Sequence, residues 1–366
     1  MKRTKPPFRA DHVGSILRTA AIKEARAKCE RNEISAADLR AVEDREIETI
    51  ITKQEETGLQ SVTDGEFRRA WWHLDFLEQL TGAESFFREQ GVAFHGVQTR
   101  PKGVRVVGKL GFNGHPMIEH FRFLQAHTKR MPKMTIPSPT AMHYREGRAG
   151  ISKSVYPDIA DFFHDLGEAY RKAVLAFADA GCRYLQLDEV YLALLCDPEQ
   201  HKILRSQGED PDRLPTVYAD VINRAISDIP SDMTITMHLC RGNFRSTFMA
   251  SGGYEPVADT LFNGLNVDGY FMEYDTERAG GFEPLRLVPK NKTVVLGLIT
   301  SKVGTLEGKD AIKRRIEQAT KFIDIDQLAL SPQCGFASTE EGNILTEDEQ
   351  WAKLRRVVEI AEEVWG

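Results

Sequence analysis

Short apolar runs alternate with longer amphipathic segments along most of the chain. The short runs are rich in β-branched and aromatic residues and are bounded by turn residues, a pattern that predicts strands. Strands that alternate with helices are typical of parallel strands joined by crossover helices. The eight predicted strands cover residues 11–17, 58–66, 133–140, 183–190, 233–240, 269–274, 293–300 and 327–335.

The segments between these runs predict helices. Residues 157–180 begin with an Asp-rich turn, and residues 308–323 are apolar on one face. The last helix, 346–365, opens with Thr346 and Glu349 at the spacing of a capping box. Eight strand-helix units without a linker predict an α/β fold, a single TIM-type (β/α)8 barrel that forms one catalytic domain over residues 1–366. A doubly wound open sheet is the alternative.

One stretch between the second and third predicted strands departs from this alternation. Roughly over residues 93–112, the run GVRVV has flanks rich in Gly and Pro, which favours a β-hairpin over a helix. We interpret the stretch as an insert in the barrel and not as a second domain.

Composition and charge narrow the classes of partner. The chain has 366 residues, of which 41% are hydrophobic and 28% charged, and its net charge of −6 argues against nucleic acid as a partner. No apolar run is long enough to cross a bilayer, so we expect no membrane segment and a cytoplasmic location. Five cysteines without a CxxC spacing predict reduced thiols.

Several predicted strands end in polar residues. The active site of a barrel lies at the carboxyl ends of its strands, so polar residues at these positions are candidates for catalysis or binding. We expect them to lie on one side of the fold. They are Asp64 and Glu66 at the end of the second strand, Asp188 and Glu189 at the end of the fourth, His238 and Cys240 at the fifth, Glu273 at the sixth and Cys334 at the eighth.

His238 and Cys240 are two positions apart, so on a strand their side chains lie on the same face. Together with Glu273 and Cys334 they form a set of nitrogen, sulfur and oxygen donors that suits Zn²⁺ better than Mg²⁺ or Ca²⁺. Each residue also has an ordinary structural interpretation. His238 and Cys240 are compatible with a packed imidazole beside a buried thiol, and Glu273 with a solvated loop residue. Glu66 and Asp188 are compatible with helix caps.

The chain resembles, over nearly its whole length, the catalytic C-terminal barrel of the cobalamin-independent methionine synthase family. The zinc motif of that family is His-x-Cys, then a Glu about one βα unit later, then Cys-Gly after a Pro. It is matched by His238, Cys240, Glu273 and the segment Pro332-Gln-Cys334-Gly335. The resemblance therefore implies that these residues bind zinc.

The acceptor site of the family is also matched. The resemblance implies that Gly14 and Ser15 contact the carboxylate of homocysteine through their backbone, and that Glu66 and Asp188 bind its amino group. It implies a zinc-dependent methyltransferase that acts on the thiol of homocysteine or a close analogue and gives methionine. The partners would be small molecules, and the oligomeric state is left open.

Three departures from the family concern the methyl donor. Full-length members carry a second, N-terminal barrel, for which we expect no room in this chain. In the family a Trp stacks on folate, and its position falls near Pro139 in this chain. A His of the family that donates a proton aligns with Lys302. We therefore expect a donor other than folate polyglutamate.

Two residues are candidates for direct roles in the reaction. Lys302 would supply a proton to the leaving donor, and a solvated loop lysine is the equally weighted alternative. Glu273 would leave the metal when the substrate thiol binds. Two other functions stay open at this point, a decarboxylase barrel of the uroporphyrinogen type and a zinc-binding or thiol-binding protein without catalysis.

Overall fold

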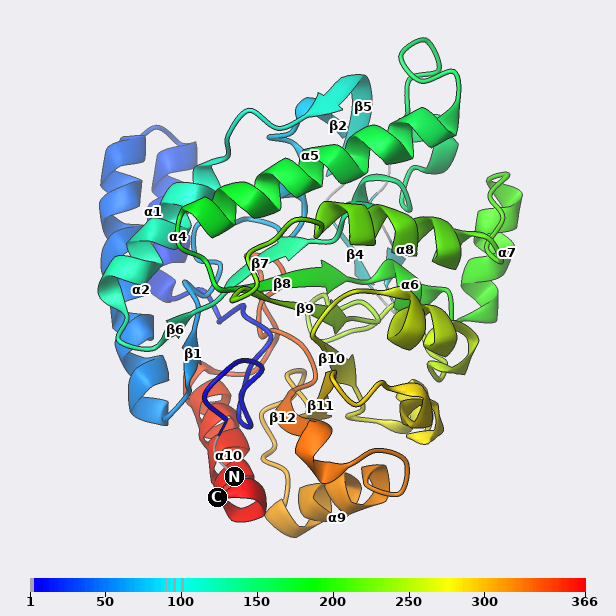
Figure 1. Ribbon diagram of the computed structural model, residues 1–366. Coiled ribbons are helices and arrows are strands. Elements are labelled where there is room, and N and C mark those ends of the chain that lie inside the picture. Colours follow the sequence, from blue (N-terminus) through cyan, green and yellow to red (C-terminus); the bar gives the residue numbers. More distant parts are fainter. Residues whose placement is uncertain (1–2, 90, 92, 95–96, 100–101) are drawn as a thin grey trace.

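A six-stranded parallel sheet lies at the centre of the protein (Figure 1). The structure is a computed structural model that describes residues 3–89, 91, 93–94, 97–99 and 102–366. All neighbouring strands are parallel, and strands consecutive in the chain are neighbours in the sheet. Their carboxyl ends therefore meet at one edge. The strands are β7 (Met134–Pro137), β8 (Tyr184–Glu189), β9 (Thr234–Leu239), β10 (Gly269–Glu273), β11 (Thr293–Ile299) and β12 (Leu328–Pro332).

These six strands lie within the last six predicted strands, which confirms the parallel α/β organisation. The second predicted strand is reduced to β1 (Ser61–Val62), which pairs in parallel with β6 (Met131–Pro132). Since only Lys133 separates β6 from β7, this pair continues the arrangement beyond the edge of the six-stranded sheet.

The first predicted strand, 11–17, is wrong. In its place the chain makes one parallel bridge, Ala10 with Leu330, and then leaves the ladder. Gly14 has a φ of 141°, outside the strand region. The Asp11 carboxylate accepts hydrogen bonds from the backbone of Phe8 and His12, so side chains take over the role of a ladder. Within the described residues, the strand ladders do not link eight consecutive strands. The parallel α/β organisation is therefore confirmed, whereas closure of the predicted barrel stays a prediction.

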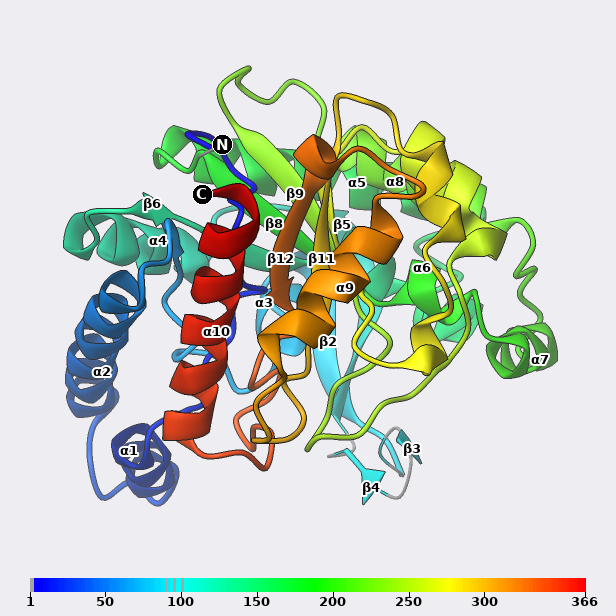
Figure 2. The same ribbon diagram turned by 90° about the horizontal axis from the view of Figure 1, so that it is seen from below.

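Amphipathic helices cover the sheet, as the periodicity predicts. The helix predicted over 157–180 is α5, capped by Asp158, and α10 begins with the predicted capping box between Thr346 and Glu349. Figure 2 shows α10 beside β12. The helices are α1 (Ala20–Glu30), α2 (Ala36–Thr57), α3 (Leu74–Leu77), α4 (Pro116–His127), α5 (Ile159–Asp179), α6 (Tyr191–Leu194), α7 (Pro198–Ser206), α8 (Leu214–Ala225), α9 (Lys309–Ala319) and α10 (Glu347–Trp365).

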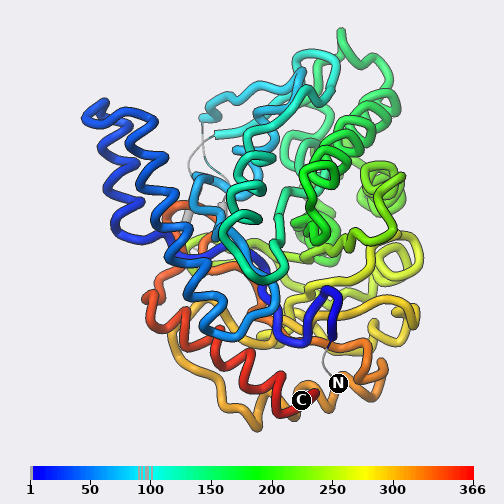
Figure 3. The backbone as a smooth tube through the Cα atoms, turned by 60° about the vertical axis from the view of Figure 1, so that its left-hand side comes forward, coloured from blue at the N-terminus to red at the C-terminus, as the bar shows by residue number. Residues whose placement is uncertain are grey.

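Two of the helices were not anticipated as a pair. Figure 3 shows α1 and α2 side by side at the margin of the molecule, joined by a short turn. A capping box between Ser35 and Asp38 starts α2, and Gly58, in the left-handed conformation, ends it. The chain then enters β1, so α2 delivers the segment that carries Glu66.

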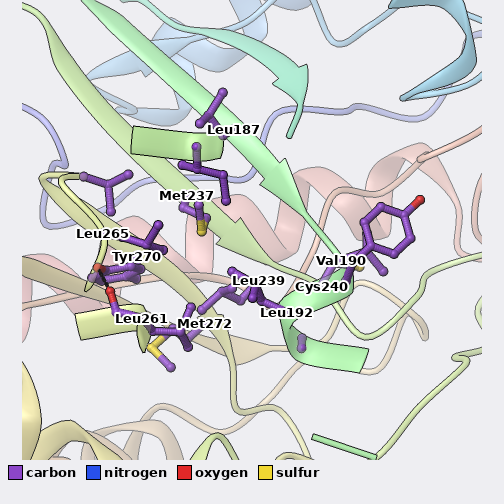
Figure 4. Packing of buried hydrophobic residues seen from close by; sticks show 14 of the residues in the cluster. Leu187, Val190, Leu192, Met237, Leu239, Cys240, Leu261, Leu265, Tyr270 and Met272 are labelled. Carbon is purple, nitrogen blue, oxygen red and sulfur yellow. Dashed lines mark hydrogen bonds between the residues drawn. The ribbon is translucent and has the colours of Figure 1, made fainter. Parts of the chain in front are cut away.

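Alternate residues of β9 face the helices. Met237 and Leu239 pack in one buried cluster with Leu261 and Met272, as Figure 4 shows. Because side chains alternate along a strand, His238 lies on the opposite face from these two residues. Because Met237 and Leu239 pack toward the helices, the imidazole of His238 lies on the face of the sheet that is turned away from them.

The predicted insert over 93–112 differs from the structure. Strand β5 (Lys102–Gly111) lies within it, but its antiparallel partner is β2 (Thr81–Phe87), which precedes the predicted limits. A second small pair joins β3 (Ala93–Phe94) to β4 (Val97–Gln98). Residues 92, 95–96 and 100–101 lie outside the described part of the chain. The predicted limits missed β2, whose sequence TGAESFF mixes polar and aromatic residues without a long apolar run.

Candidate metal centre and acceptor pocket

Four potential metal ligands meet at the carboxyl ends of the strands. His238 lies on β9 and Cys240 follows it, Glu273 ends β10, and Cys334 lies two residues beyond β12. All four are buried, and one potential ligand atom from each lies within 4.8 Å of the others. His238 Nε2 is 3.3 Å from Cys334 Sγ, which is 3.6 Å from Cys240 Sγ. The structure thus brings together the whole predicted set, to which we refer as the metal group.

The spacing and chemistry of the metal group suit a tetrahedral zinc ion. Zinc bond lengths to nitrogen and sulfur place neighbouring ligands about 3.3–3.8 Å apart in a tetrahedron. The imidazole–thiol and thiol–thiol distances lie in that range. A donor set of one nitrogen, two sulfurs and one carboxylate favours zinc over hard cations. The residues present therefore fit the ion that the sequence motif implies.

The pKa values of the two thiols of the metal group are shifted in opposite directions. The hydrogen bond from Cys240, together with the neighbouring His238, holds the pKa of Cys334 well below its usual range although burial opposes this. The same hydrogen bond, reinforced by burial, raises the pKa of Cys240. One thiolate is thus stabilised by the site itself. A bound cation would deprotonate the second thiol as well.

Glu273 is held by nitrogen donors on both carboxylate oxygens. The backbone N–H of Arg241 donates to Oε1 at 3.2 Å, and Arg278 Nη2 donates to Oε2 at 2.7 Å. Burial raises the pKa of Glu273, and the charge of Arg278 opposes that shift. The carboxylate is therefore fixed in position by a buried cation.

The segment that carries Gly14 and Ser15 lies against the loop that follows Cys334. The backbone carbonyl of Ser15 accepts a hydrogen bond from Phe336 N at 3.0 Å, and its hydroxyl accepts one from Ala337 N at 3.3 Å. A side chain at Gly14 would lie 2.7 Å from Thr135, so the backbone can take this path only without a Cβ.

Glu66 and Asp188 form a pair of buried carboxylates in the same region. Thr135 donates a hydrogen bond to Glu66 Oε1, whereas Glu66 Oε2 is buried and has no hydrogen-bond partner among the described residues. Burial, followed by the charge of Glu66, raises the pKa of Asp188 to about 7. A cation between them would relieve both desolvation and repulsion.

A single cavity joins the carboxylates to the metal group. Its lining includes Ser15 and Glu66 from N-terminal loops, Asp188 and His238 from β8 and β9, and Cys334 from the loop after β12. The cavity measures about 40 Å³.

Lys302 has a different environment from the other predicted residues. Its ammonium group donates to Asn243 Oδ1 and to the carbonyl oxygen of Thr247, both at 3.1 Å. The loop that carries these acceptors follows Cys240. Lys302 therefore holds this loop in place and does not line the cavity. Its role as a proton donor stays a prediction.

Known proteins that resemble this chain in sequence and structure identify its family. Residues 8–363 match the family described as the cobalamin-independent synthase catalytic domain. The chain belongs to this family. Two Bacillus subtilis relatives, the uncharacterized proteins YxjG and YxjH, are 54% and 53% identical over the whole chain and over 97% and 96% of their own lengths.

Family members with a stated activity are more distant. A 5-methyltetrahydropteroyltriglutamate–homocysteine methyltransferase of Bacillus subtilis is 24% identical over 96% of this chain, which spans 42% of that longer protein. A candidate vitamin-B12-independent methionine synthase from Listeria monocytogenes has a crystal structure 44% identical to this chain, with a TM-score of 0.80 and full coverage of both chains. A Shewanella B12-independent methionine synthase in complex with selenomethionine shares the fold, with 18% identity, a TM-score of 0.74 and 97% coverage of both.

Three residues near the cavity and the metal group were not among the candidates chosen from the sequence. Trp72 and Phe94 line the cavity, and Arg278 contacts Glu273. None of them lies at the end of a predicted strand, which was the criterion for candidates. Pro139, near which the folate-stacking Trp of the family aligns, starts a buried 3-10 turn. None of the described helices has the length and apolar character needed to cross a membrane.

Proposed function

We propose that the protein is a zinc-dependent methyltransferase that transfers a methyl group to the thiol of homocysteine or a close analogue, giving methionine. One observation carries the proposal. The cavity beside His238 and the two cysteines is also lined by Asp188 and by Glu66, whose buried Oε2 has no hydrogen-bond partner within the described residues. In a molecule that bears both a thiol and an ammonium group, the sulfur would reach the metal group and the ammonium group would pair with the two carboxylates.

His238, Cys240, Glu273 and Cys334 would hold the zinc ion, which would act as a Lewis acid that keeps the substrate sulfur in its nucleophilic thiolate form. The other residues bind and orient the substrate. Glu66 and Asp188 would take the ammonium group, and the backbone at Gly14 and Ser15 the carboxylate. This fixes the sulfur for in-line attack on the methyl carbon.

The reaction forms a carbon–sulfur bond and breaks the bond between the methyl group and the donor. The electron pair of that bond stays on the donor, and a donor nitrogen also needs a proton. We propose Lys302 for this role because it replaces the family's His. Its ammonium group first has to leave Asn243 and Thr247.

The donor that we propose is a small molecule other than folate polyglutamate. Pro139 offers no aromatic face where the family's folate platform would lie, and lysine is a weaker acid than histidine unless burial lowers its pKa. Trp72 and Phe94 supply aromatic surface at another wall of the cavity. A donor with a better leaving centre, such as methylcobalamin, would depend less on a proton donor at this position.

A donor comparison tests the function. Zinc-loaded protein and homocysteine are mixed with methylcobalamin or with methyltetrahydrofolate triglutamate at equal concentration, and initial rates of methionine formation are measured. We expect methylcobalamin to be faster. A clear preference for the triglutamate contradicts the donor proposal, whereas homocysteine binding without transfer from any donor supports a binding protein without catalysis.

We also propose that residues 1–366 act as one catalytic barrel domain. The match to the family over residues 8–363 and the parallel six-stranded sheet support this proposal. The decarboxylase alternative loses its support, because the family match and the metal group both favour methyl transfer. A single cooperative unfolding transition of the whole chain is the expected result, and two separate transitions would contradict it.

A further inference from the structure

A buried cation lies directly against the carboxylate of the metal group. Arg278 follows β10 in a short turn, Glu277–Ala279, and its Nη2 donates to Glu273 Oε2 at 2.7 Å. Its second acidic partner is Asp275, at 3.1 Å. The side chain of Arg278 is 10% exposed and that of Glu273 is fully buried. In such surroundings a charge-assisted hydrogen bond is strong, and a carboxylate without a partner is costly.

Glu273 differs in this respect from the rest of the metal group. His238, Cys240 and Cys334 face one another at 3.3 and 3.6 Å. Both oxygens of Glu273, by contrast, accept hydrogen bonds from nitrogen. Glu273 is thus a potential ligand for which a cation of the protein already competes with a metal ion.

The guanidinium of Arg278 is fixed from the other side as well. Its Cζ lies 4.8 Å from the centre of the Phe248 ring, in the loop that follows Cys240. The carbonyl oxygen of Arg278 accepts a hydrogen bond from Gly252 N at 2.8 Å. These contacts hold the arginine beside Glu273 whether or not the carboxylate binds a metal ion.

We propose that Arg278 is a positioning residue that holds the Glu273 carboxylate when a substrate thiol takes its place at the zinc ion. The inference rests on the proposed function. Without Arg278 a displaced carboxylate would be buried without a neighbouring positive charge, so thiol binding would become less favourable. The positive charge of Arg278 also opposes the nearby Zn²⁺, so its removal should strengthen metal binding. The two affinities should therefore change in opposite directions.

The test compares Arg278→Met with the wild type in two binding experiments. Zinc affinity is measured by competition with a chromophoric chelator, and thiol binding by titrating the cobalt(II)-substituted protein with homocysteine while following its visible spectrum. We expect zinc to bind about tenfold more tightly and homocysteine about tenfold more weakly. Arg278→Lys keeps the charge, so its affinities for zinc and homocysteine should lie between those of the wild type and Arg278→Met.

Matched controls separate this role from a structural one. Arg286→Met removes an exposed arginine paired with Glu255 and should change neither affinity. Circular dichroism of the metal-free variants checks the fold. Unchanged affinities, or zinc and homocysteine binding that weaken together, would overturn the inference, since both results assign Arg278 a merely supporting role.

The failure of the proposed function would look different. If homocysteine leaves the spectrum of the wild-type cobalt protein unchanged, the acceptor assignment is wrong. In that case the zinc affinity alone decides whether Arg278 competes with the metal ion for Glu273. Tighter zinc binding by Arg278→Met supports competition for Glu273, and equal or weaker binding refutes it.

Discussion

Two of the clusters of buried charge in this fold differ in how completely the polar atoms of their charged groups are satisfied. In the first, Lys133 is fully buried and donates to the carbonyl oxygen of His12, with Asp11 3.4 Å away. Asp11 in turn accepts hydrogen bonds from Ser61 and Tyr184. The charges of this cluster are enclosed by protein groups, as expected of a structural ion pair.

The second cluster, around Glu66 and Asp188, contains two carboxylates whose pKa values are raised by burial. Its nearest cation, Arg69, lies 3.7 Å from Glu66 Oε1, and Glu66 Oε2 has no partner among the described residues. The comparison teaches that burial of charge alone does not mark a site. What marks it is the part of the charge that the protein leaves unsatisfied for a ligand.

The largest expected effect concerns the metal group, which borders the unsatisfied cluster. Cys240→Ser or Cys334→Ser should each remove most of the bound zinc, because an alcohol is a far weaker zinc ligand than a thiolate. Metal analysis of the purified proteins is the measurement. Cys29→Ser, outside the site, serves as the control, and undiminished zinc in both site variants would refute the metal group.

The next effect tests the satisfied cluster. Lys133→Met removes one partner of a buried ion pair and should lower the free energy of unfolding by about 3–5 kcal/mol. Denaturant titration measures this loss. Zinc content of the folded variant should stay at the wild-type level, and a variant as stable as the wild type would show that Asp11 is satisfied without the lysine.

Substitution of the unsatisfied cluster should have the opposite consequence for stability. Glu66→Gln and Asp188→Asn each remove one of two repelling carboxylates, so the free energy of unfolding should stay equal or rise. Homocysteine binding should weaken by about tenfold or more, since a charge-assisted hydrogen bond contributes roughly 1.5–3 kcal/mol.

A thiol without an amino group provides the control for these two variants. 4-Mercaptobutyrate should bind the wild type and both variants equally poorly. If homocysteine binds the variants as tightly as the wild type, Glu66 and Asp188 do not form an ammonium site.

The smallest expected effect concerns Lys302. Lys302→Met removes two hydrogen bonds to the loop after Cys240 and should lower the free energy of unfolding by roughly 1.5 kcal/mol, the low end of the range for hydrogen bonds of a charged group. The rate of methyl transfer tells its two roles apart. A loss of rate that is larger with a nitrogen donor than with methylcobalamin supports proton donation, whereas equal losses leave only the anchoring of the loop.

The sequence predicted the regular part of the fold and the metal group for the same reason. Apolar alternation locates β9, and a position two residues along a strand has only one orientation relative to His238. It failed at residues 11–17, where the Asp11 carboxylate accepts hydrogen bonds from the backbone of His12 and Gly14 has a φ outside the strand region. Asp11 is held in turn by Ser61 and Tyr184, which are distant in the sequence, and local patterns contain no information on such contacts.

The candidate site shows the same limit. The ends of the predicted strands made Glu66, Asp188 and the metal group candidates, because each follows a run of buried residues. Arg278 and Trp72 lie in turns, and their proximity to the site depends on how loops return to it. The lack of a partner for Glu66 Oε2 is likewise a property of the packed molecule that no motif records.

Zinc K-edge X-ray absorption of the zinc-loaded protein, with and without homocysteine, tests the central claim most directly. The account predicts two sulfur ligands in the free protein and three with homocysteine, together with the loss of an oxygen ligand. The spectrum of the Glu66→Gln variant should need more homocysteine to reach the same change. A sulfur count that homocysteine does not alter at any concentration would contradict the assignment of this cavity to an amino-acid thiol.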